Sequence, residues 1–421
     1  MKKIVLSIAA VMAAAAFAPE ASAVPVFARQ TGMACSACHF QHFPLLNGFG
    51  RAFKSAGFTM MGAQGKIEGE HLSLPDTLNM GILTSAYYQN EKNTGGVTAP
   101  KFGVPGSGGE LSMFYGGRIS EFAGFLSELG LAGGPAQTGA AKIAFLFPVG
   151  DARVGFTAYT GGQGAAYGYE VLNTGAADTH KLMGNAGPNK QHVAATYAAS
   201  YMGTRTNATG INLVANADFG FITLGKYADA AVGAGANTLP LTYARAAYIF
   251  DMAGWDSAVG IQNFSGNMVA LGVANSYKAT ILDAQFQGEI GGMSTGFYVT
   301  YATAPADAVN PNLMNAGWSP VTKAGNAPVA AAAVGSSTSF NVAGSLELIP
   351  GIATIQGAVR RAKNGNFANT GDNAIMIGAT YELAQNIEIG LNHTVNSGSA
   401  WNGLVNPAGK TSTTLLLETL F

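Results

Sequence analysis

Two cysteines and a histidine near the N-terminus are the residues whose types and spacing point most directly to chemistry. The run Cys35-Ser36-Ala37-Cys38-His39 has the C-x-x-C-H spacing of a c-type haem attachment motif. In such a motif the two thiols add across the porphyrin vinyl groups, and the adjacent histidine binds the iron as an axial ligand. The chain holds no other cysteine. The sequence therefore predicts one covalently bound haem c, attached to Cys35 and Cys38 and ligated by His39.

Two other uses of paired cysteines fit the sequence less well. A structural disulfide between Cys35 and Cys38 would close a very small loop and would leave His39 without a role. A thioredoxin-like redox motif would need a βαβ context, and no such pattern surrounds these residues.

The second axial position on the haem iron is left open by the sequence. His42 lies three residues after His39, so on a helix it would share the side of His39 and would not reach the opposite haem face. The candidates for a distal ligand are Met60, Met61 and His71, which are far enough along the chain to fold back. A methionine thioether would raise the reduction potential relative to a second histidine. An open or water-ligated iron is the remaining alternative.

The first 23 residues have the organisation of a secretory signal peptide. Lys2 and Lys3 precede an apolar run, and Ala21-Ser22-Ala23 supplies an A-x-A cleavage site. Export agrees with the motif, because haem is attached to c-type cytochromes after they leave the cytoplasm.

The composition limits how an exported chain of this kind can fold. Only 11% of its 421 residues are charged, against about 25% in ordinary soluble domains, while 48% are hydrophobic. The net charge of −1 offers no basic surface for nucleic acid. Beyond the signal peptide no apolar run approaches the roughly 18–20 residues of a membrane-spanning helix. A closed β-barrel is the other structure that satisfies its backbone within hydrocarbon, so outer-membrane lipid is an expected partner.

Segments of alternating apolar and small or polar residues support the barrel. In 339–348 the residues Phe340, Val342 and Leu348 share one face, opposite Asn341 and Glu347. The other segments with this pattern are 77–88, 110–120, 140–148, 151–160, 211–219, 220–228, 242–250, 255–264, 277–287, 293–303, 352–362, 374–383, 387–395 and 413–421. The last of these ends on Phe421, as bacterial outer-membrane barrels often do. About 20–22 residues per strand and connection over the chain from residue 76 give about 16 strands. A soluble β-sandwich or propeller would need more surface charge.

The expected fold is therefore all-β. It is a transmembrane antiparallel barrel of about 16 strands (residues 76–421), preceded by a signal peptide (1–23) and a short, mainly helical haem segment (24–75). A segment of this size is marginal as an independent domain, so we expect it to plug or cap the barrel. Arg29, His42 and Arg51 are candidates for binding the haem propionates. Arg29 and Arg51 are equally candidates for pairing with barrel carboxylates.

The sequence around the motif resembles a known family. Residues 27–32 (FARQTG), the motif itself and residues 43–54 (FPLLNGFGRAFK) are similar to the fused monohaem cytochrome–porins of outer membranes, whose best-known members are the iron oxidases of iron-oxidising bacteria. The resemblance covers about 33 residues and implies an oxidoreductase in the outer membrane of a Gram-negative bacterium. Fe(II) would be its substrate, and the electron would pass through the haem to a periplasmic carrier such as a soluble cytochrome.

Two functions of other kinds stay open. The chain is alternatively a diffusion porin whose haem segment is a structural or regulatory plug, or an outer-membrane cytochrome that exchanges electrons with another donor or acceptor. Direct contact with Fe(II) would favour oxygen ligands, for which the sequence offers Glu68, Glu70, Asp76, Glu91 and Asp178 without singling out a set.

Overall fold

The computed structural model describes most of the chain. The described residues are 25–62, 64–92, 98–131, 139–175, 208–229, 238–270, 273–307, 309–310, 312–316, 335–363, 365, 371–401 and 410–421. The predicted signal peptide, residues 1–23, lies outside these ranges.

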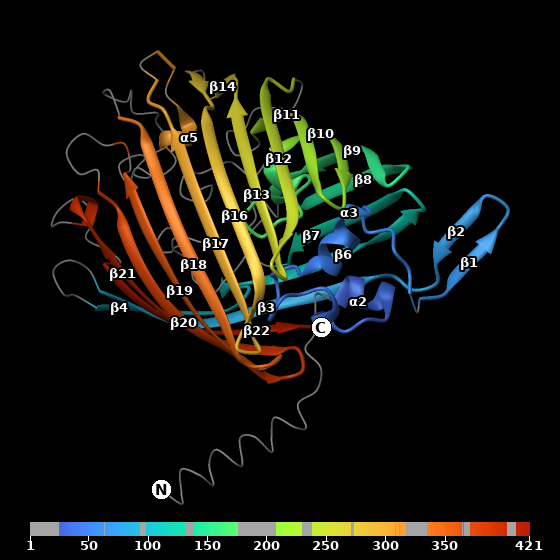
Figure 1. Ribbon diagram of the computed structural model, residues 1–421, viewed down its shortest axis with the longest axis horizontal. Coiled ribbons are helices and arrows are strands. Elements are labelled where there is room, and N and C mark those ends of the chain that lie inside the picture. Colours follow the sequence, from blue (N-terminus) through green and yellow to red (C-terminus); the bar gives the residue numbers. More distant parts are fainter. Residues whose placement is uncertain are drawn as a thin grey trace, which may run out of the picture.

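A closed antiparallel barrel makes up most of the molecule (Figure 1). Each wall strand pairs with neighbours on both sides, and the last strand pairs with the first. The wall strands are β3 (Met80–Lys92), β6 (Leu111–Ser120), β7 (Ala123–Gly130), β8 (Ala140–Val149), β9 (Ala152–Thr160), β10 (Ala208–Ala217), β11 (Gly220–Asp229), β12 (Leu241–Met252), β13 (Trp255–Ser265), β16 (Ala279–Ile290), β17 (Met293–Ala304), β18 (Ser337–Ile349), β19 (Ala353–Lys363), β20 (Asn373–Ala384), β21 (Ile387–Ser397) and β22 (Thr411–Leu420).

Two short strands are inserted between β3 and β6. These are β4 (Thr98–Pro105) and β5 (Gly108–Gly109). β3 pairs with β4 along Tyr87–Lys92 and directly with β6 along Met80–Thr84. The described wall therefore has sixteen principal strands, which confirms the expected architecture.

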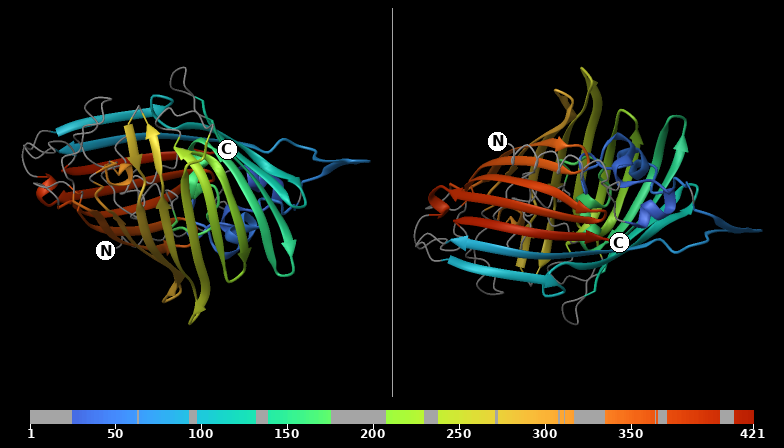
Figure 2. Two further views of the ribbon diagram at one scale, coloured as in Figure 1. Left: turned by 90° about the horizontal axis from the view of Figure 1, so that it is seen from above. Right: turned by 90° about the horizontal axis from the view of Figure 1, so that it is seen from below.

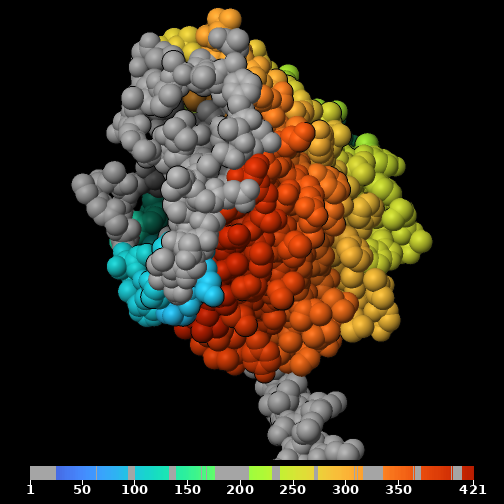
Figure 3. All heavy atoms as spheres, turned by 90° about the vertical axis from the view of Figure 1, so that its left-hand side faces the viewer, coloured from blue at the N-terminus to red at the C-terminus, as the bar shows by residue number. Residues whose placement is uncertain are grey.

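The wall follows the alternation expected from the sequence. Outward-facing Leu213, Ile222 and Ile377 are each at least 60% exposed, whereas inward-facing Asn212 and Asn341 are completely buried. Apolar side chains thus cover the outside of the ring, and polar ones line its inside, as in barrels embedded in outer membranes. Figure 3 shows part of this outer surface, formed by β18 to β22. No described helix is long and apolar enough to cross a membrane.

Fifteen of the sixteen strands coincide with segments predicted from the sequence, to within a few residues. The prediction missed β7. The adjacent apolar residues Phe125 and Leu126 break the alternation in this strand, and its pairing with β6 and β8 supplies the missing signal.

The two ends of the barrel differ in their connections. At one end, called here the short-turn end, two residues join β8 to β9, β10 to β11, β12 to β13, β16 to β17 and β20 to β21. In the β16–β17 turn both Gly291 and Gly292 have positive φ angles, as a tight hairpin requires. At the opposite end the connections are longer, and two of them span residues 161–207 and 305–336.

The N-terminal segment lies at the short-turn end, beside the chain's C-terminus (Figures 1 and 2). Its helices are α2 (Pro25–Thr31), η1 (Cys35–Ala37) and α3 (Gly48–Ser55). The expectation of a mainly helical segment is not confirmed, because these helices are short and residues 66–75 form a hairpin of β1 (Lys66–Gly69) and β2 (Leu72–Pro75). In that hairpin Ile67 faces Leu74 across the strands, and His71 takes a positive φ in the turn.

A second segment, residues 161–175, fills the interior beyond the N-terminal segment. It contains η2 (Gly161–Gln163) and η3 (Ala165–Tyr167). Glu170 accepts a hydrogen bond from Arg245 at 3.0 Å, and Thr174 donates one to Asp283 at 2.7 Å. All four side chains are buried. The segment is therefore bound to β12 and β16 by ionic and polar contacts inside the wall.

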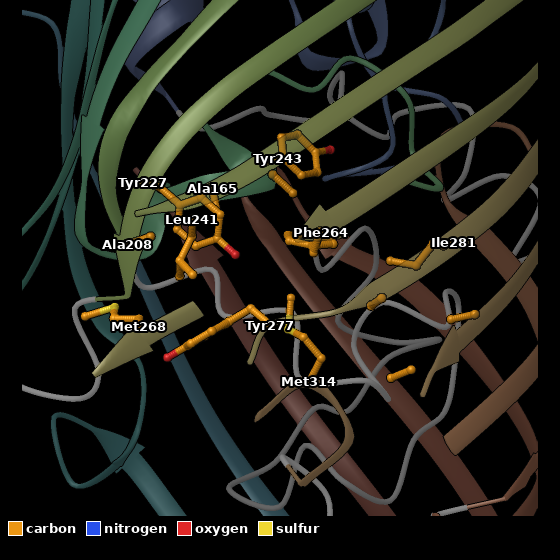
Figure 4. Packing of buried hydrophobic residues seen from close by; sticks show 14 of the residues in the cluster. Ala165, Ala208, Tyr227, Leu241, Tyr243, Phe264, Met268, Tyr277, Ile281 and Met314 are labelled. Carbon is orange, nitrogen blue, oxygen red and sulfur yellow. The ribbon is translucent and has the colours of Figure 1, made fainter. Parts of the chain in front are cut away.

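Aromatic and aliphatic side chains pack beside this segment toward the long-connection end. Tyr227, Tyr243, Phe264 and Tyr277 are at most 1% exposed and belong to one cluster with Ala165 of η3 (Figure 4). The rings of Tyr243 and Phe264 lie 4.8 Å apart. The cluster covers the inner face of β9 to β13, β16 and β17 at this level. The remaining short elements are β14 (Asn267–Ala270), β15 (Val273–Ser276), α5 (Leu313–Ala316) and η7 (Ser399–Trp401).

The placement of the wall in a bilayer predicts a depth-dependent cost for lysine on its outer face. Ile377 is in the middle of β20, so Ile377→Lys should lower the free energy of unfolding by about 2–4 kcal/mol. Leu383 lies on the same face near the strand end, and Leu383→Lys should cost only about 0–1 kcal/mol. Denaturant unfolding from phospholipid vesicles measures both variants. Equal losses would contradict this placement.

Candidate functional site

The C-x-x-C-H motif forms one tight turn. The amide of Cys38 donates to the carbonyl of Cys35 at 3.0 Å, and the amide of His39 donates to the same carbonyl at 2.9 Å. Both cysteines are free thiols, Cys35 buried and Cys38 partly exposed. Burial raises the pKa of Cys35 to about 12, with a smaller contribution from the charge of Glu382, and burial also raises the pKa of Cys38. The turn therefore presents two protonated thiols, spaced along the chain as haem attachment requires.

The ring of His39 is held by a backbone contact. Its Nδ1 lies 3.1 Å from the carbonyl oxygen of Leu45. A carbonyl can only accept, so Nδ1 carries the proton and Nε2 keeps a lone pair. Burial lowers the pKa of His39 to about 4, which keeps the ring neutral at neutral pH. A backbone carbonyl on one ring nitrogen is the usual outer contact of a metal-binding histidine. The donor set therefore fits an axial ligand to iron.

Asn47 and Gly50 join the motif to α3. The Asn47 side chain caps the helix by accepting from the amide of Gly50 at 2.9 Å, and its amide donates to the carbonyl of Ala37 at 3.1 Å. A Cβ on Gly50 would lie 2.1 Å from the carbonyl oxygen of Cys38. The helix can approach the motif this closely only with glycine at position 50.

Aromatic side chains form a small core in the N-terminal segment. The ring of Phe27 stacks on that of Phe58 at 5.0 Å and meets the edge of Phe53 at 4.9 Å. Phe43 lies closest to the motif, with its ring 5.4 Å from that of His39. Most of these rings pack the segment, and Phe43 flanks the candidate iron ligand.

A pocket at the short-turn end brings the motif against the barrel wall. It is lined by Cys35, Ser36, His39, Gln41, His42, Phe43, Gly351, Glu382, Asn386, Glu388, Glu418 and Leu420. The three glutamates belong to β20, β21 and β22. They lie more than 340 positions from the motif in the chain, and no sequence pattern links them to it.

His42 binds the wall through one of these glutamates. Its Nδ1 lies 3.2 Å from the carboxylate of Glu388. Burial lowers the pKa of His42, but the charge of Glu388, the hydrogen bond to it and the weaker influence of Glu347 outweigh burial and raise the pKa overall. His42 was a candidate for a haem propionate, and in this structure it pairs with a barrel carboxylate.

The two arginine candidates also contact the barrel. Arg51 is buried and forms an ion pair with Asp256 of β13, and it donates to Gln287 of β16 at 3.3 Å. Arg29 donates to the carbonyl of Met80, where β3 begins. Of the partners offered by the sequence, the barrel carboxylate is the one that Arg51 has in the structure. Both arginines attach the segment to the wall.

The three distal-ligand candidates do not line the described pocket of His39. The backbone of Met60 accepts from the side chain of Gln30 at 2.7 Å, so this stretch runs beside α2, and Met61 follows it. His71 is at the tip of the β1–β2 hairpin with its side chain 93% exposed. The structure therefore brings none of them to the motif and leaves the distal position without an assigned residue.

The carboxylates considered for Fe(II) are not gathered into a site. Glu68, Glu70 and Asp76 lie in or beside the hairpin, and Glu91 is paired with Lys101 at 2.7 Å. Asp178 is outside the described residues. Within the described part of the chain, no three His, Cys, Asp or Glu residues are arranged to hold a metal ion.

Comparisons with known proteins give only distant structural likenesses. No family model matches the chain, and no curated protein matches it. The chain is similar to the trimer form of OmpT from Vibrio cholerae, with 9% identity, a TM-score of 0.44, and coverage of 82% of this chain and 99% of that one. A double mutant of Rh. blastica porin has 13% identity and a TM-score of 0.46, with coverage of 82% and 100%. Likenesses at this level carry no information about activity or substrate.

The contact between α3 and the motif predicts unequal effects of alanine at two glycines. Gly50→Ala should lower the stability of the docked N-terminal segment by about 1–3 kcal/mol, because the new methyl group overlaps the Cys38 carbonyl. Gly48→Ala is the matched control in the same helix, since its Cβ would meet Asp256 at an ordinary 3.5 Å. Amide hydrogen exchange over residues 25–62 measures both. Equal protection in the two variants would contradict the geometry.

The pairing of His42 predicts a pH dependence of docking. The pKa of His42 is raised above its ordinary value of 6.5 in the docked segment, so the pairing contributes fully below about pH 6.5 and is lost as pH rises through the raised pKa. Hydrogen exchange in residues 39–46, corrected for the intrinsic rate, should therefore accelerate over this range. Glu388→Gln should remove most of the acceleration, and an unchanged pH profile in that variant would refute the role of the pair.

Proposed function

We propose that this protein is a single-electron relay of the outer membrane of a Gram-negative bacterium, carrying one haem c on Cys35 and Cys38 with His39 as axial ligand. The neutral ring of His39 carries the proposal, because the Leu45 carbonyl holds its Nδ1 and leaves Nε2 available. When bound, the haem would supply a one-electron couple that accepts an electron from extracellular Fe(II) and passes it to a periplasmic carrier.

The position of the motif supports this direction of transfer. Short turns of outer-membrane barrels face the periplasm and long loops face outward, so the motif would lie at the periplasmic mouth, within reach of a soluble carrier. The residues of the segment keep it there. Arg51 and His42 bind carboxylates on β13 and β21, and Gln41 donates to the backbone of Ser294 at 2.8 Å.

The contacts of the segment inside the barrel support a defined position for the motif. Asn173 of the inner segment donates to the carbonyl of Leu46 at 2.9 Å and accepts from its amide at 2.8 Å. The segment that binds β12 and β16 is thus continuous with the one that carries the motif. This contact buries Glu170 and Arg245, both at most 1% exposed, against the inner face of the wall.

A diffusion porin with a haem-bearing plug is the second candidate. It is favoured by the wall itself, a closed ring of sixteen principal strands with a polar inner face. In that function, the N-terminal segment and residues 161–175 would narrow the path of the solute. The two candidates therefore differ in a property that transport measurements detect.

Haem content and reduction by Fe(II) test the relay. Full-length protein produced with c-type haem maturation should carry one covalent haem per chain, measured by its pyridine haemochrome spectrum. Cys35→Ser/Cys38→Ser should abolish covalent attachment of the haem. His39→Ala should keep the attachment but change the haem absorption bands that depend on histidine ligation. His393→Gln, on the outer face of β21 and outside the motif pocket, is the control and should keep both.

The same protein separates the relay from the porin. When haem-loaded wild-type protein is mixed with Fe(II), its haem should be reduced on the timescale of mixing. Liposomes that contain the same protein should not swell in solutions of small sugars. Absence of reduction together with rapid sugar entry would reject the relay in favour of the porin. Reduction by other donors but not by Fe(II) would retain the relay and change its substrate.

A further inference from the structure

The β1–β2 hairpin has an apolar face that no described residue covers. Ile67, Leu72 and Leu74 are 52%, 42% and 50% exposed. The register pairs Ile67 with Leu74 and Gly69 with Leu72, so these residues share one face of the two-stranded sheet. The opposite face is polar, with Lys66 3.7 Å from Glu68 and Ser73 donating to Glu68 at 3.0 Å.

Most of the hairpin projects away from the barrel. In each ribbon view it extends beyond the N-terminal segment, while part of β2 stays close to wall strand β6 (Figures 1 and 2). Its base is fixed, because Gln64 donates to the carbonyl of Thr77 at 2.7 Å and to Asn79 at 2.9 Å. A two-stranded hairpin is marginally stable in water by itself, and a clustered exposed apolar face commonly marks an interaction site.

The base of the hairpin is close to the motif pocket along the barrel rim. The pocket includes Glu418 and Leu420 of β22, which pair with Ser85 and Leu83 of β3. β3 begins at Met80, directly after the hairpin's stem. A protein bound to the hairpin would therefore lie at the same end of the barrel as Cys35 and His39.

The charges of the hairpin and its stem select the kind of partner. Glu68, Glu70 and Asp76 outnumber the single cation Lys66. The hairpin and its stem therefore carry a net negative charge beside the apolar face. A second copy of the chain would bring the same carboxylates opposite these, which is unfavourable. Anionic phospholipid headgroups would also be repelled. A soluble protein with a positive charge and an apolar patch complements both the carboxylates and the apolar face of the hairpin.

We propose that β1–β2 is the docking arm for the periplasmic carrier, and that this carrier is a basic, soluble protein with an exposed apolar patch. The inference rests on the proposed relay and names the class of its acceptor. Apolar contacts with Ile67, Leu72 and Leu74 hold the carrier at the hairpin, while the carboxylates accelerate encounter. Redox partners typically bury little surface and separate quickly, which suits a single hairpin.

Binding of a lysine-rich soluble cytochrome c to the full-length, haem-loaded protein in nanodiscs tests the arm. Ile67→Ser/Leu72→Ser/Leu74→Ser should raise Kd by about tenfold or more. Ser73→Ala, on the polar face of the same hairpin, should change Kd less than about twofold. Glu68→Gln/Glu70→Gln should weaken binding and flatten its salt dependence. Glu289→Gln, an exposed carboxylate at the same end outside the hairpin, should do neither.

Two results would overturn the docking arm. The first is an unchanged Kd in both the triple serine variant and the double glutamine variant of the hairpin. An unchanged haem spectrum would show that the N-terminal segment is folded in these variants. The second is protection of amides 67–74 in nanodiscs before any cytochrome is added, because lipid or another copy would then cover the face. Failure of the proposed relay is measured separately. It would appear as a wild-type protein that carries no covalent haem, or whose haem is not reduced by Fe(II).

Discussion

The pairing of β22 with β3 is the interaction on which the rest of the structure depends. A sheet surrounded by hydrocarbon must satisfy every backbone N–H and C=O internally, and only closure removes the two free edges. Ten register pairs from Thr411–Lys92 to Leu420–Leu83 close this ring. Closure also places Phe421 beside the start of β3. The N-terminal segment precedes β3 in the chain, so it lies at the same short-turn end of the barrel. The position of the haem motif is in this sense a consequence of barrel closure.

The segment is kept at that rim by polar and ionic contacts more than by a core of its own. Its internal apolar packing is a few rings around Phe27, and the attachments are made by Arg51, His42 and Gln41 to three separate parts of the wall. Buried charges are costly unless they are paired, so each pair favours one docked position of the segment. The same contacts give the motif a defined place relative to the pocket glutamates, which a freely moving plug would lack.

The proposed relay draws on how these parts are combined. Residues 161–175 join the N-terminal segment to β12 and β16 by hydrogen bonds and an ion pair inside the ring. The hairpin then leaves Leu72 and Leu74 about half exposed, as expected of an interaction surface. The proposed relay, with a partner at the short-turn end, would use both features.

The sequence by itself determined the local features of this protein, because they depend on near neighbours in the chain. Alternation with period two identified fifteen wall strands, and the spacing of Cys35, Cys38 and His39 identified the motif. Tertiary structure alone decided which residues meet across long separations: Arg51 with Asp256, His42 with Glu388, and the distance of His71 from the motif. No local pattern encodes such pairs, since strand register and ring closure set them. The hairpin at 66–75 was missed for the related reason that two four-residue strands are too short for periodicity to detect.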